Sequence, residues 1–501
     1  MISRMFCFGL LNCVFGDNRN RGVTIGKLIS VEQSAFIKGR SILDGVLVAN
    51  EVVDFLKRKN KKGLIFKVDF EKAYDSVEWS FLLDAMENMG FGLKWRNWVK
   101  SCLSTSKVSV LVNGSPTGEF SMERGLRQGD PLAPFLFLIM TEGLHLLINE
   151  ALEKGLYKGV NGPDNVINLL KVLKCFQAVS GLKLNLKKSK IYGIGVEIVE
   201  VQGWVNMLGC GFGELPFIYL GLPVGTALKR SSLWLPVIEK MKRKLSLWKA
   251  KMISFGGRRT LIKLVLGSVS LYYFLLLRAP VSVLKTLEGI RNNFFWGGGD
   301  GSSIGEKPKR VCHWVKWEKV VTSFERGGLS IGNLNDLNLC LLGKWWWRFM
   351  VERGSLWVRV IKSIYVREGG LSRDVVVGGM GRNSVWVKII KVGEELEKKG
   401  IAFRNSFRRI VGNGVGTSFW EDVWIEEGRL REKYNRLYRL EVNKNVTVAG
   451  SGVFEGDMWS WKWRWRRNPR GRELGELERL WKLIQGGKPI KGGRGPGIME
   501  S

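Results

Sequence analysis

Residues 66–79 read F-K-V-D-F-E-K-A-Y-D-S-V-E-W, and the chain is organised around this stretch. An apolar run of β-forming residues, Gly63 to Val68, ends on Asp69, and Tyr74 and Asp75 follow shortly after. A strand that stops on a carboxylate and turns into a helix can hold a divalent cation at a fixed place on a sheet edge, because Mg²⁺ takes oxygen ligands and keeps several waters. A plain strand end with Asp75 capping a helix explains the same residues, so this stretch alone leaves both interpretations open.

A second stretch, Arg124 to Pro134, reads R-G-L-R-Q-G-D-P-L-A-P and precedes an apolar helix predicted from Phe135 to about Ile148. Glycine lets backbone approach a ligand closely, proline opens helices, and arginine together with exposed backbone N–H groups suits phosphate. The pattern predicts a loop that faces a phosphate-bearing ligand.

Together, the two stretches resemble motifs A and B of reverse transcriptases from LINE-type (non-LTR) retrotransposons, especially those of plants. Three further segments are similar to that family's fingers segment, motif D and primer-grip motif E: Gln33 to Asp44, Ser180 to Lys190, and Tyr219 to Pro223. The motifs follow the family's order, and the resemblance covers roughly residues 26–226.

The resemblance implies an α+β fold, the right-hand polymerase with fingers, palm and thumb. We expect an irregular leader over residues 1–25, fingers and palm over 26–230, a helical thumb-like region over 231–296, a glycine-rich linker over 297–310, and a basic, Trp-rich, helix-rich region over 311–501. The front of the chain looks truncated against the family, and the cysteine/histidine-rich module that often ends those proteins is not seen, since no cysteine follows Cys340.

The resemblance also assigns roles. Asp69 is the expected catalytic carboxylate and ligand of Mg²⁺ or Mn²⁺, Phe70 contributes a backbone carbonyl, and Tyr74 is the steric gate that favours dNTPs. The other expected substrate-binding residues are Gln128 and Gly129 near the templating pair, Arg127 in the same loop, Lys187 and Lys188 near the triphosphate, and Arg40, which reaches phosphates from the fingers.

Motif C, an aromatic-x-Asp-Asp on a strand–turn–strand, is expected between the motif B helix and motif D. No Asp-Asp pair occurs in the 501 residues. The apolar positions from Val166 to Phe176 have helical spacing, so the next helix leaves little room for that hairpin. Asp164 lies near the junction, but beside Pro163. We therefore expect an incomplete palm with exposed sheet edges, weakened metal binding and defective catalysis.

Composition indicates the partner. The 79 Lys and Arg outnumber 46 Asp and Glu, a formal charge of +33 that favours a polyanion such as nucleic acid over a merely solvated basic surface. Seven scattered cysteines and two histidines favour neither a disulfide framework nor a zinc knuckle. The most apolar run, Leu264 to Leu277, is shorter than the roughly 20 residues that cross a bilayer. We expect an RNA template, an RNA–DNA or DNA duplex and dNTPs as partners, no membrane, and a location in the nucleus or the cytoplasm, with the nucleus favoured.

Beyond residue 200 lie 18 of the 21 tryptophans. Leu233 to Lys251 and Arg258 to Leu277 predict two long basic helices of the thumb, which would grip duplex phosphates. Farther on, clusters such as residues 459–472, W-S-W-K-W-R-W-R-R-N-P-R-G-R, interleave aromatic and basic side chains. These tryptophans either stack on bases or pack a small core beneath basic residues that face water.

Three hypotheses about function remain open at this stage: an active RNA-directed DNA polymerase, a nucleic-acid-binding relic without chemistry, and a non-functional pseudogene fragment. The first is what the motifs name, and the missing Asp-Asp pair favours the other two.

Overall fold

The computed structural model describes residues 25–156, 163–226, 230–246, 252–298, 312–365, 369–370, 383–401, 403, 407–425, 428–490 and 497–500. The expected leader, most of the 297–310 linker and the junction at 157–162 lie outside these residues. Two compact units divide the chain: Met1–Leu233 with Ser355–Trp386, and Trp234–Gly354 with Val387–Ser501. Each unit is described by itself.

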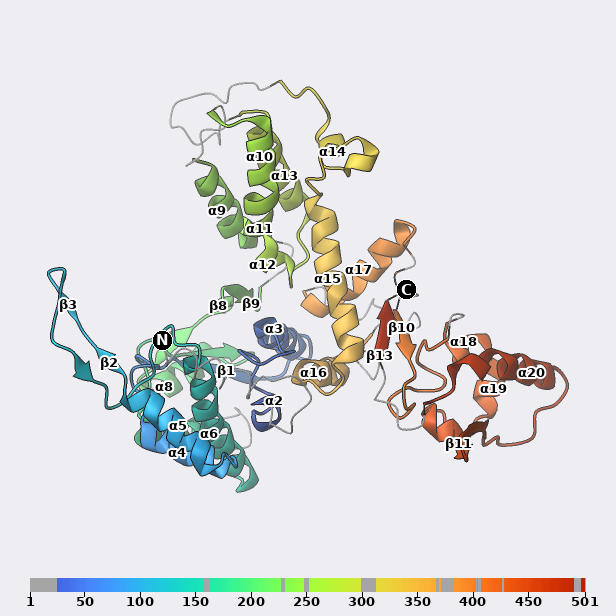
Figure 1. Ribbon diagram of the computed structural model, residues 1–501, viewed down its shortest axis with the longest axis horizontal. Coiled ribbons are helices and arrows are strands. Elements are labelled where there is room, and N and C mark those ends of the chain that lie inside the picture. Colours follow the sequence, from blue (N-terminus) through green and yellow to red (C-terminus); the bar gives the residue numbers. More distant parts are fainter. Residues whose placement is uncertain are drawn as a thin grey trace. The chain divides into compact units, whose positions relative to one another are not determined.

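A three-stranded sheet lies in the first unit (Figure 1). Strand β1 (Gly63–Lys67) pairs antiparallel with β6 (Lys190–Ile194), and β6 runs parallel to β7 (Gly211–Gly213). The predicted strand before Asp69 is thus confirmed. Its pairing joins motif A directly to the segment after motif D, and β1 is the last strand on its side of this sheet.

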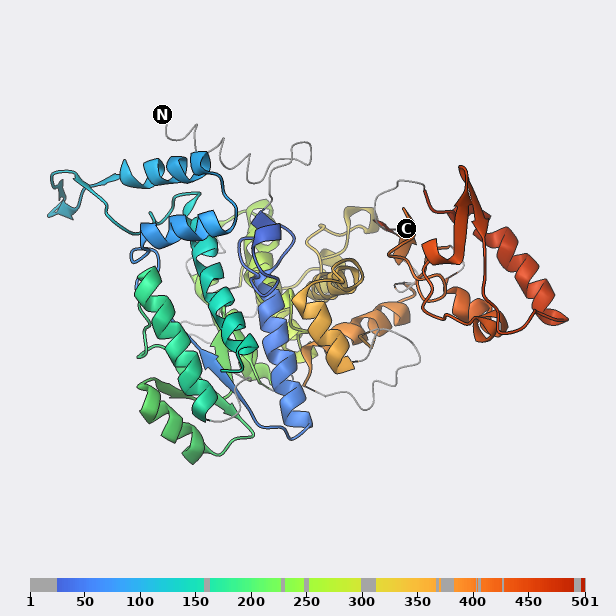
Figure 2. The same ribbon diagram turned by 90° about the horizontal axis from the view of Figure 1, so that it is seen from below.

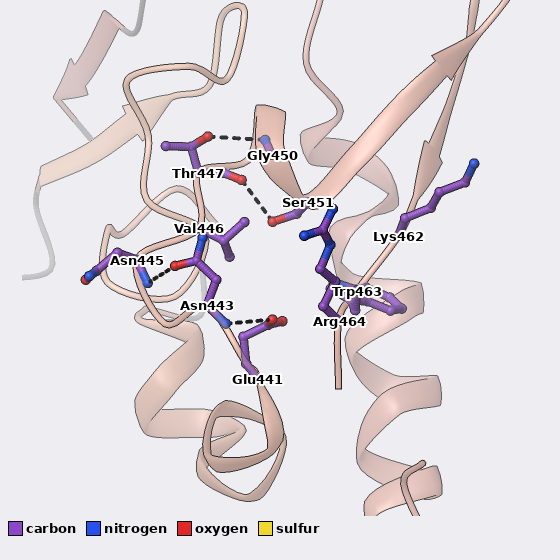
Figure 3. A pocket seen from close by; sticks show the side chains of 10 residues that line it. All are labelled: Glu441, Asn443, Asn445, Val446, Thr447, Gly450, Ser451, Lys462, Trp463 and Arg464. Carbon is purple, nitrogen blue, oxygen red and sulfur yellow. Dashed lines mark hydrogen bonds between the residues drawn. The ribbon is translucent and has the colours of Figure 1, made fainter. Parts of the chain in front are cut away.

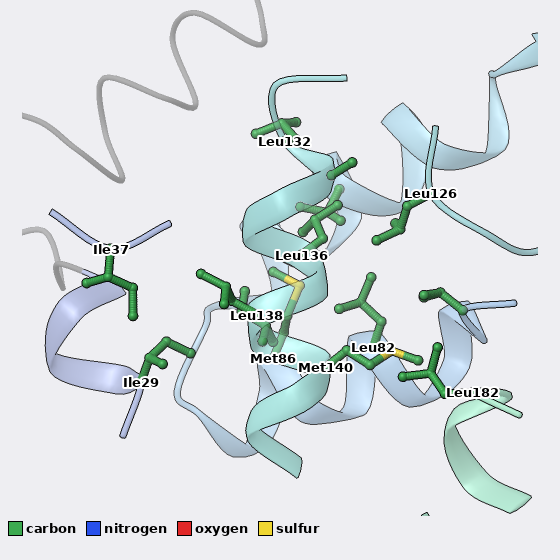
Figure 4. Packing of buried hydrophobic residues seen from close by; sticks show 14 of the residues in the cluster. Ile29, Ile37, Leu82, Met86, Leu126, Leu132, Leu136, Leu138, Met140 and Leu182 are labelled. Carbon is green, nitrogen blue, oxygen red and sulfur yellow. The ribbon is translucent and has the colours of Figure 1, made fainter. Parts of the chain in front are cut away.

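Five helices pack around this sheet and on one another: α4 (Trp79–Asn88), α5 (Leu93–Ser104), α6 (Ala133–Glu153), α7 (Pro163–Ser180) and α8 (Ile198–Leu208). Figure 4 shows α6 at the centre of a hydrophobic core, with Ile29 and Ile37 on one side and Leu126 and Leu182 on the other. The predicted apolar helix after motif B is confirmed, and it extends to Glu153 because its apolar residues continue beyond Ile148.

Helix α6, and not the run from Leu264 to Leu277, is the described helix that is long and apolar enough to cross a membrane. About 33% of its most apolar window is buried inside the protein. Its inward residues, among them Leu136 and Met140, pack in the core, and the carboxylate of Glu142 accepts hydrogen bonds from the Ser30 N–H and hydroxyl at 3.1 Å. Such contacts are typical of a core helix.

The fingers helix α3 (Ile42–Arg58) begins at Ser41, whose side chain forms a capping box with Asp44. Helix α16 (Leu356–Tyr365) packs on α3. The fully buried carboxylate of Glu51 accepts hydrogen bonds from the hydroxyls of Tyr365 (2.5 Å) and Ser384 and from the Trp386 N–H (2.8 Å). These bonds explain why residues 355–386 belong to the first unit.

Two hairpins lie in this unit. Strands β2 (Lys107–Val108) and β3 (Leu111–Val112) pair with β5 (Phe120–Ser121) and β4 (Ser115–Pro116) around a left-handed Asn113-Gly114 turn. In Figures 1 and 2 this arm projects away from α4 and α5. Motif E forms the second hairpin, β8 (Phe217–Tyr219) and β9 (Leu222–Val224), and β9 packs on α3.

The short helix η1 (Ser231–Trp234) spans the boundary between the two units. The second unit continues with α9 (Leu235–Ser246), α10 (Phe255–Leu261), a π-helical segment η3 (Ile262–Leu266), α11 (Gly267–Val269), α12 (Leu271–Phe274) and α13 (Val281–Phe295). The predicted long helix over 258–277 is thus present as a run of helical elements from Phe255 to Phe274 that is not regular throughout. The π segment changes its hydrogen-bond pattern, and a turn at Ser270, whose side chain is fully buried, interrupts it.

Further helices of this unit are α14 (Trp317–Val320), η4 (Phe324–Arg326), α15 (Leu334–Val351) and most of α17 (Val385–Lys398). Arg278 links them: its guanidinium donates to Glu395 at 2.7 Å, to Asn335 at 2.8 Å and to Asn338 at 3.0 Å. The neighbouring Trp345 and Trp346 are buried and donate their indole N–H groups to the backbone oxygens of Leu275 and Ile389.

The C-terminal part contains α18 (Leu430–Lys433), α19 (Asn435–Leu440), η7 (Ala449–Ser451), β11 (Gly452–Glu455), β12 (Met458–Trp461), α20 (Arg472–Ile484) and η8 (Gln485–Gly487), with β10 (Phe407–Ile410) paired to β13 (Gly497–Glu500). Trp420, Trp424 and Trp461 are buried in one cluster, and Trp463 and Trp465 pack against it. Lys462, Arg464 and Arg466 alternate with these rings and are exposed. The core-packing interpretation of the tryptophans is therefore the correct one for this module.

Candidate functional site

Asp69 follows β1, and its backbone is held from both sides. Its N–H donates to the buried Ser189 hydroxyl at 3.1 Å, and its carbonyl accepts the Asn185 N–H at 2.8 Å. Phe70 continues this contact as a bridge to Leu184. The segment identified as motif D thus fixes the main chain that carries the motif A carboxylate. Sequence reasoning missed Asn185 and Ser189, whose positions within motif D are the only signal for this role.

Tyr74 joins motif A to motif B. Its ring stacks on Phe137 of α6, with centroids 5.0 Å apart and planes 19° apart. Its carbonyl accepts the Leu126 N–H at 2.7 Å, and the Gly125 carbonyl accepts the Trp79 indole N–H at 2.8 Å. The ring expected to act as the steric gate is therefore fixed on the motif B helix.

Glycine is required where these loops meet. Gly125 has a φ of +87°, and a Cβ there would lie 2.8 Å from the Asp75 carbonyl oxygen. Gly129 has a φ of +92°, but a Cβ there would meet nothing within 4 Å. Gly129 thus needs glycine for its backbone conformation alone, whereas Gly125 also needs it for the close approach of motif A.

The expected substrate-binding residues Arg127, Gln128 and Gly129 are exposed in the loop before α6. The Arg127 guanidinium donates to the Lys107 carbonyl at 3.2 Å, and the Asp130 carboxylate accepts the Leu132 N–H at 2.8 Å. Asp130 therefore shapes the entry into the helix, and the loop presents its polar groups to solvent.

Lys187 and Lys188 are exposed on the turn that holds the Asp69 backbone. The Asn185 side chain accepts the Lys188 N–H at 3.0 Å, which closes this turn. The structure therefore places both lysines on the segment that contacts Asp69, although neither side chain contacts the carboxylate in any recorded hydrogen bond or ion pair of the described residues.

Arg40 is placed differently. Its guanidinium donates to the backbone oxygens of Ser30, Gln33 (2.6 Å) and Ile29 (2.9 Å), and burial lowers its pKa. The side chain therefore holds the loop over residues 26–40 together, a role that sequence reasoning missed because it depends on backbone oxygens and leaves no residue pattern.

The metal expected by resemblance needs several carboxylates. Within the described ranges, no group of three or more His, Cys, Asp or Glu is placed to hold a metal ion. Asp164 lies in the first turn of α7. Asp69 alone suits one hydrated cation and does not fit a two-metal site.

Comparison with known proteins agrees with this arrangement of motifs on a palm-like sheet. Residues 18–224 match the family described as "Reverse transcriptase (RNA-dependent DNA polymerase)". An Arabidopsis thaliana protein named "Putative ribonuclease H protein" is 32% identical over 200 residues, which cover 40% of this chain and 30% of that protein. The "Transposon TX1 uncharacterized 149 kDa protein" of Xenopus laevis is 23% identical over 309 residues, 56% of this chain and 23% of its own length.

A third relative is the Pol polyprotein of type-1 retrotransposable element R2 from Popillia japonica, 34% identical over 113 residues, or 22% of this chain and 16% of that protein. The fold and the motif loops thus define a nucleic-acid polymerase domain of mixed helix and strand. Residues 18–224 are a reverse transcriptase domain of the LINE type, which non-LTR retrotransposons carry. The chain spans less than a third of the length of each of these relatives. Members of this family depend on divalent metal and use a nucleic-acid template and dNTPs.

Proposed function

We propose that this chain is a retrotransposon-derived reverse-transcriptase-fold protein that binds an RNA template or an RNA–DNA duplex and has lost, or retains only in vestige, its polymerase chemistry. One observation supports this more than any other. Asp69 stands at the end of a palm strand without a group of carboxylates around it in the described ranges, and the whole sequence holds no Asp-Asp pair.

The chain between α6 and α7 supports the incomplete palm. Only residues 157–162 separate the described residues Leu156 and Pro163. Two paired strands of about five residues each and a turn need roughly twice that length. We therefore assign the absence of motif C to this junction. Without the motif C strands, β1 has a neighbouring strand on one side only in this sheet.

Charge supports the binding part of the proposal. The formal charge is +33. Lys187 and Lys188 are exposed on the turn that contacts Asp69, and Arg127 is exposed in the motif B loop. Phosphate contacts by such side chains supply most of the affinity for nucleic acid without sequence preference. We assign the backbone carbonyl of Phe70 to the catalytic site and the ring of Tyr74 to the sugar of a dNTP. Gln128 and Gly129 are assigned to the templating pair, and the nucleus is the proposed compartment of the protein.

The binding claim is tested by fluorescence anisotropy of a labelled RNA–DNA hybrid at several salt concentrations. We expect the logarithm of the association constant to fall linearly with the logarithm of salt concentration, and the double change Lys187→Ala, Lys188→Ala to reduce the slope by about 1 to 2. Lys154→Ala is the matched control, because Lys154 caps the far end of α6, about 30 Å along the helix from the motif B loop. Absence of binding, or equal slopes for both variants, would refute the assignment.

A further inference from the structure

A cavity of about 340 Å³ lies in the C-terminal module, far along the sequence from the polymerase motifs. One wall is the segment after α19, with Glu441, Asn443, Asn445 and Thr447, and the other is the segment that follows β12, with Lys462 and Arg464 (Figure 3). This volume is typical of small-ligand sites. The lining combines amide groups and hydroxyls with charges of both signs.

Glu441 is 1% exposed and lines the cavity. Its Oε1 accepts the Asn443 N–H at 3.3 Å, whereas its Oε2 has no hydrogen-bond partner in the part of the chain that the structure describes. Burial raises the pKa of this carboxyl, and nearby N–H groups, the Trp420 indole among them, lower it in part. The Trp420 indole N–H and Glu441 Oε2 do not reach the geometry of a hydrogen bond. A buried acceptor without a partner is costly, so a ligand that donates an N–H would stabilise it.

The opposite side of the cavity is cationic. Arg464 is exposed, and among the described residues its guanidinium makes no recorded hydrogen bond or ion pair, while Lys462 pairs with Glu455 at 3.1 Å. Figure 3 shows the Arg464 side chain extending toward Ser451, with the Glu441 carboxyl group ending nearer to Asn443. The cavity therefore offers a buried acceptor and an available guanidinium to one ligand.

We propose that this cavity binds a guanine nucleotide, either free or as an unpaired residue of single-stranded RNA, with the base edge on Glu441 and the phosphate on Arg464. Guanine presents its N1–H and its exocyclic amine side by side, beside a carbonyl acceptor, and a carboxylate accepts both donors. The side-chain amide of Asn443 carries the N–H donors that such a carbonyl accepts. A basic peptide also carries N–H donors, but Lys462 and Arg464 would repel it. This inference does not rest on the proposed polymerase relic.

Equilibrium dialysis of the full chain against GMP, guanosine, AMP, CMP and UMP tests the proposal. We expect GMP to bind about tenfold more tightly than the other three nucleotides, because one well-matched polar contact to a base discriminates to this extent or more. Glu441→Gln should weaken GMP and guanosine alike, since its amide would face the donors of the base. Arg464→Ala should weaken GMP about tenfold and leave guanosine unchanged.

Two matched controls accompany these variants: Glu478→Gln on α20, and Arg466→Ala two residues beyond Arg464, both at exposed positions outside the cavity lining. Arg464 is itself exposed, so its variant keeps the test decisive if Glu441→Gln does not fold. An RNA pentamer with one central guanine, compared with oligoadenylate, separates the sources: preference for the pentamer over GMP identifies RNA, and equal affinity identifies the free nucleotide. No GMP binding, equal binding of all four nucleotides, or unchanged GMP binding by a folded Arg464→Ala would overturn the proposal.

Discussion

Replacing Gly125 with alanine perturbs the contact between motifs A and B in a way that the structure allows us to quantify. The new Cβ would meet the Asp75 carbonyl oxygen at 2.8 Å and its carbonyl carbon and Cα at 3.1 Å, so backbone must move. The hydrogen bonds Gly125 N–H to Val77 O (2.8 Å) and Leu126 N–H to Tyr74 O (2.7 Å) would weaken, at about 1 kcal/mol each. A left-handed alanine adds about 1–2 kcal/mol.

The total, about 2–4 kcal/mol, corresponds to roughly 30- to 1,000-fold faster hydrogen exchange at the Leu126 amide, which mass spectrometry of the peptide spanning the loop measures. Gly129→Ala is the matched control, because its φ is also positive but a Cβ there meets nothing within 4 Å. We expect it to show only the conformational part, about 1–2 kcal/mol. Equal exchange rates in the two variants would refute the claim that Gly125 is required by the approach of motif A.

Three further outcomes follow from buried polar groups. Tyr365→Phe removes a donor 2.5 Å from Glu51 and should lower the free energy of unfolding by about 1.5–3 kcal/mol in urea titrations; an unchanged midpoint would contradict this. Burial raises the pKa of Glu51 above that of an unfolded glutamate. The stability that this shift contributes is therefore present below the unfolded pKa and is lost as pH rises through the folded pKa. In a pH series of unfolding experiments, Glu51→Gln should remove this part of the fall in the free energy of unfolding. Arg278→Lys cannot reproduce the fork onto Glu395 and Asn338 and should cost about 2–3 kcal/mol in calorimetry, whereas a change below about 0.5 kcal/mol would show that the network is dispensable.

Local chemistry explains what the sequence could predict. The strand before Asp69 and the apolar helix after motif B each depend on neighbouring residues only, and both are confirmed. The contact between motif A and motif D was not predicted, because the hydroxyl of Ser189 bonds to the backbone of a residue 120 positions away.

Other features depended on packing that no local pattern records. The buried bond from Tyr365 to Glu51 joins residues 314 positions apart and brings a late segment into the first unit. The periodicity over 258–277 does indicate helix, but it does not reveal the π segment or the turn at Ser270. Arg40 was expected at phosphates, and the structure commits its guanidinium to backbone oxygens. Its assignment to phosphate stays a prediction that this geometry does not favour.

Primer extension on an RNA template tests the central claim most directly. Purified full chain, a labelled DNA primer, dNTPs and Mg²⁺ or Mn²⁺ are combined under conditions in which the hybrid is bound, with Asp69→Ala as the control. Loss of polymerase chemistry predicts no extension beyond that of Asp69→Ala. Extension by the unmodified chain that disappears in Asp69→Ala would show that the missing carboxylates are dispensable or replaced, and would contradict the account.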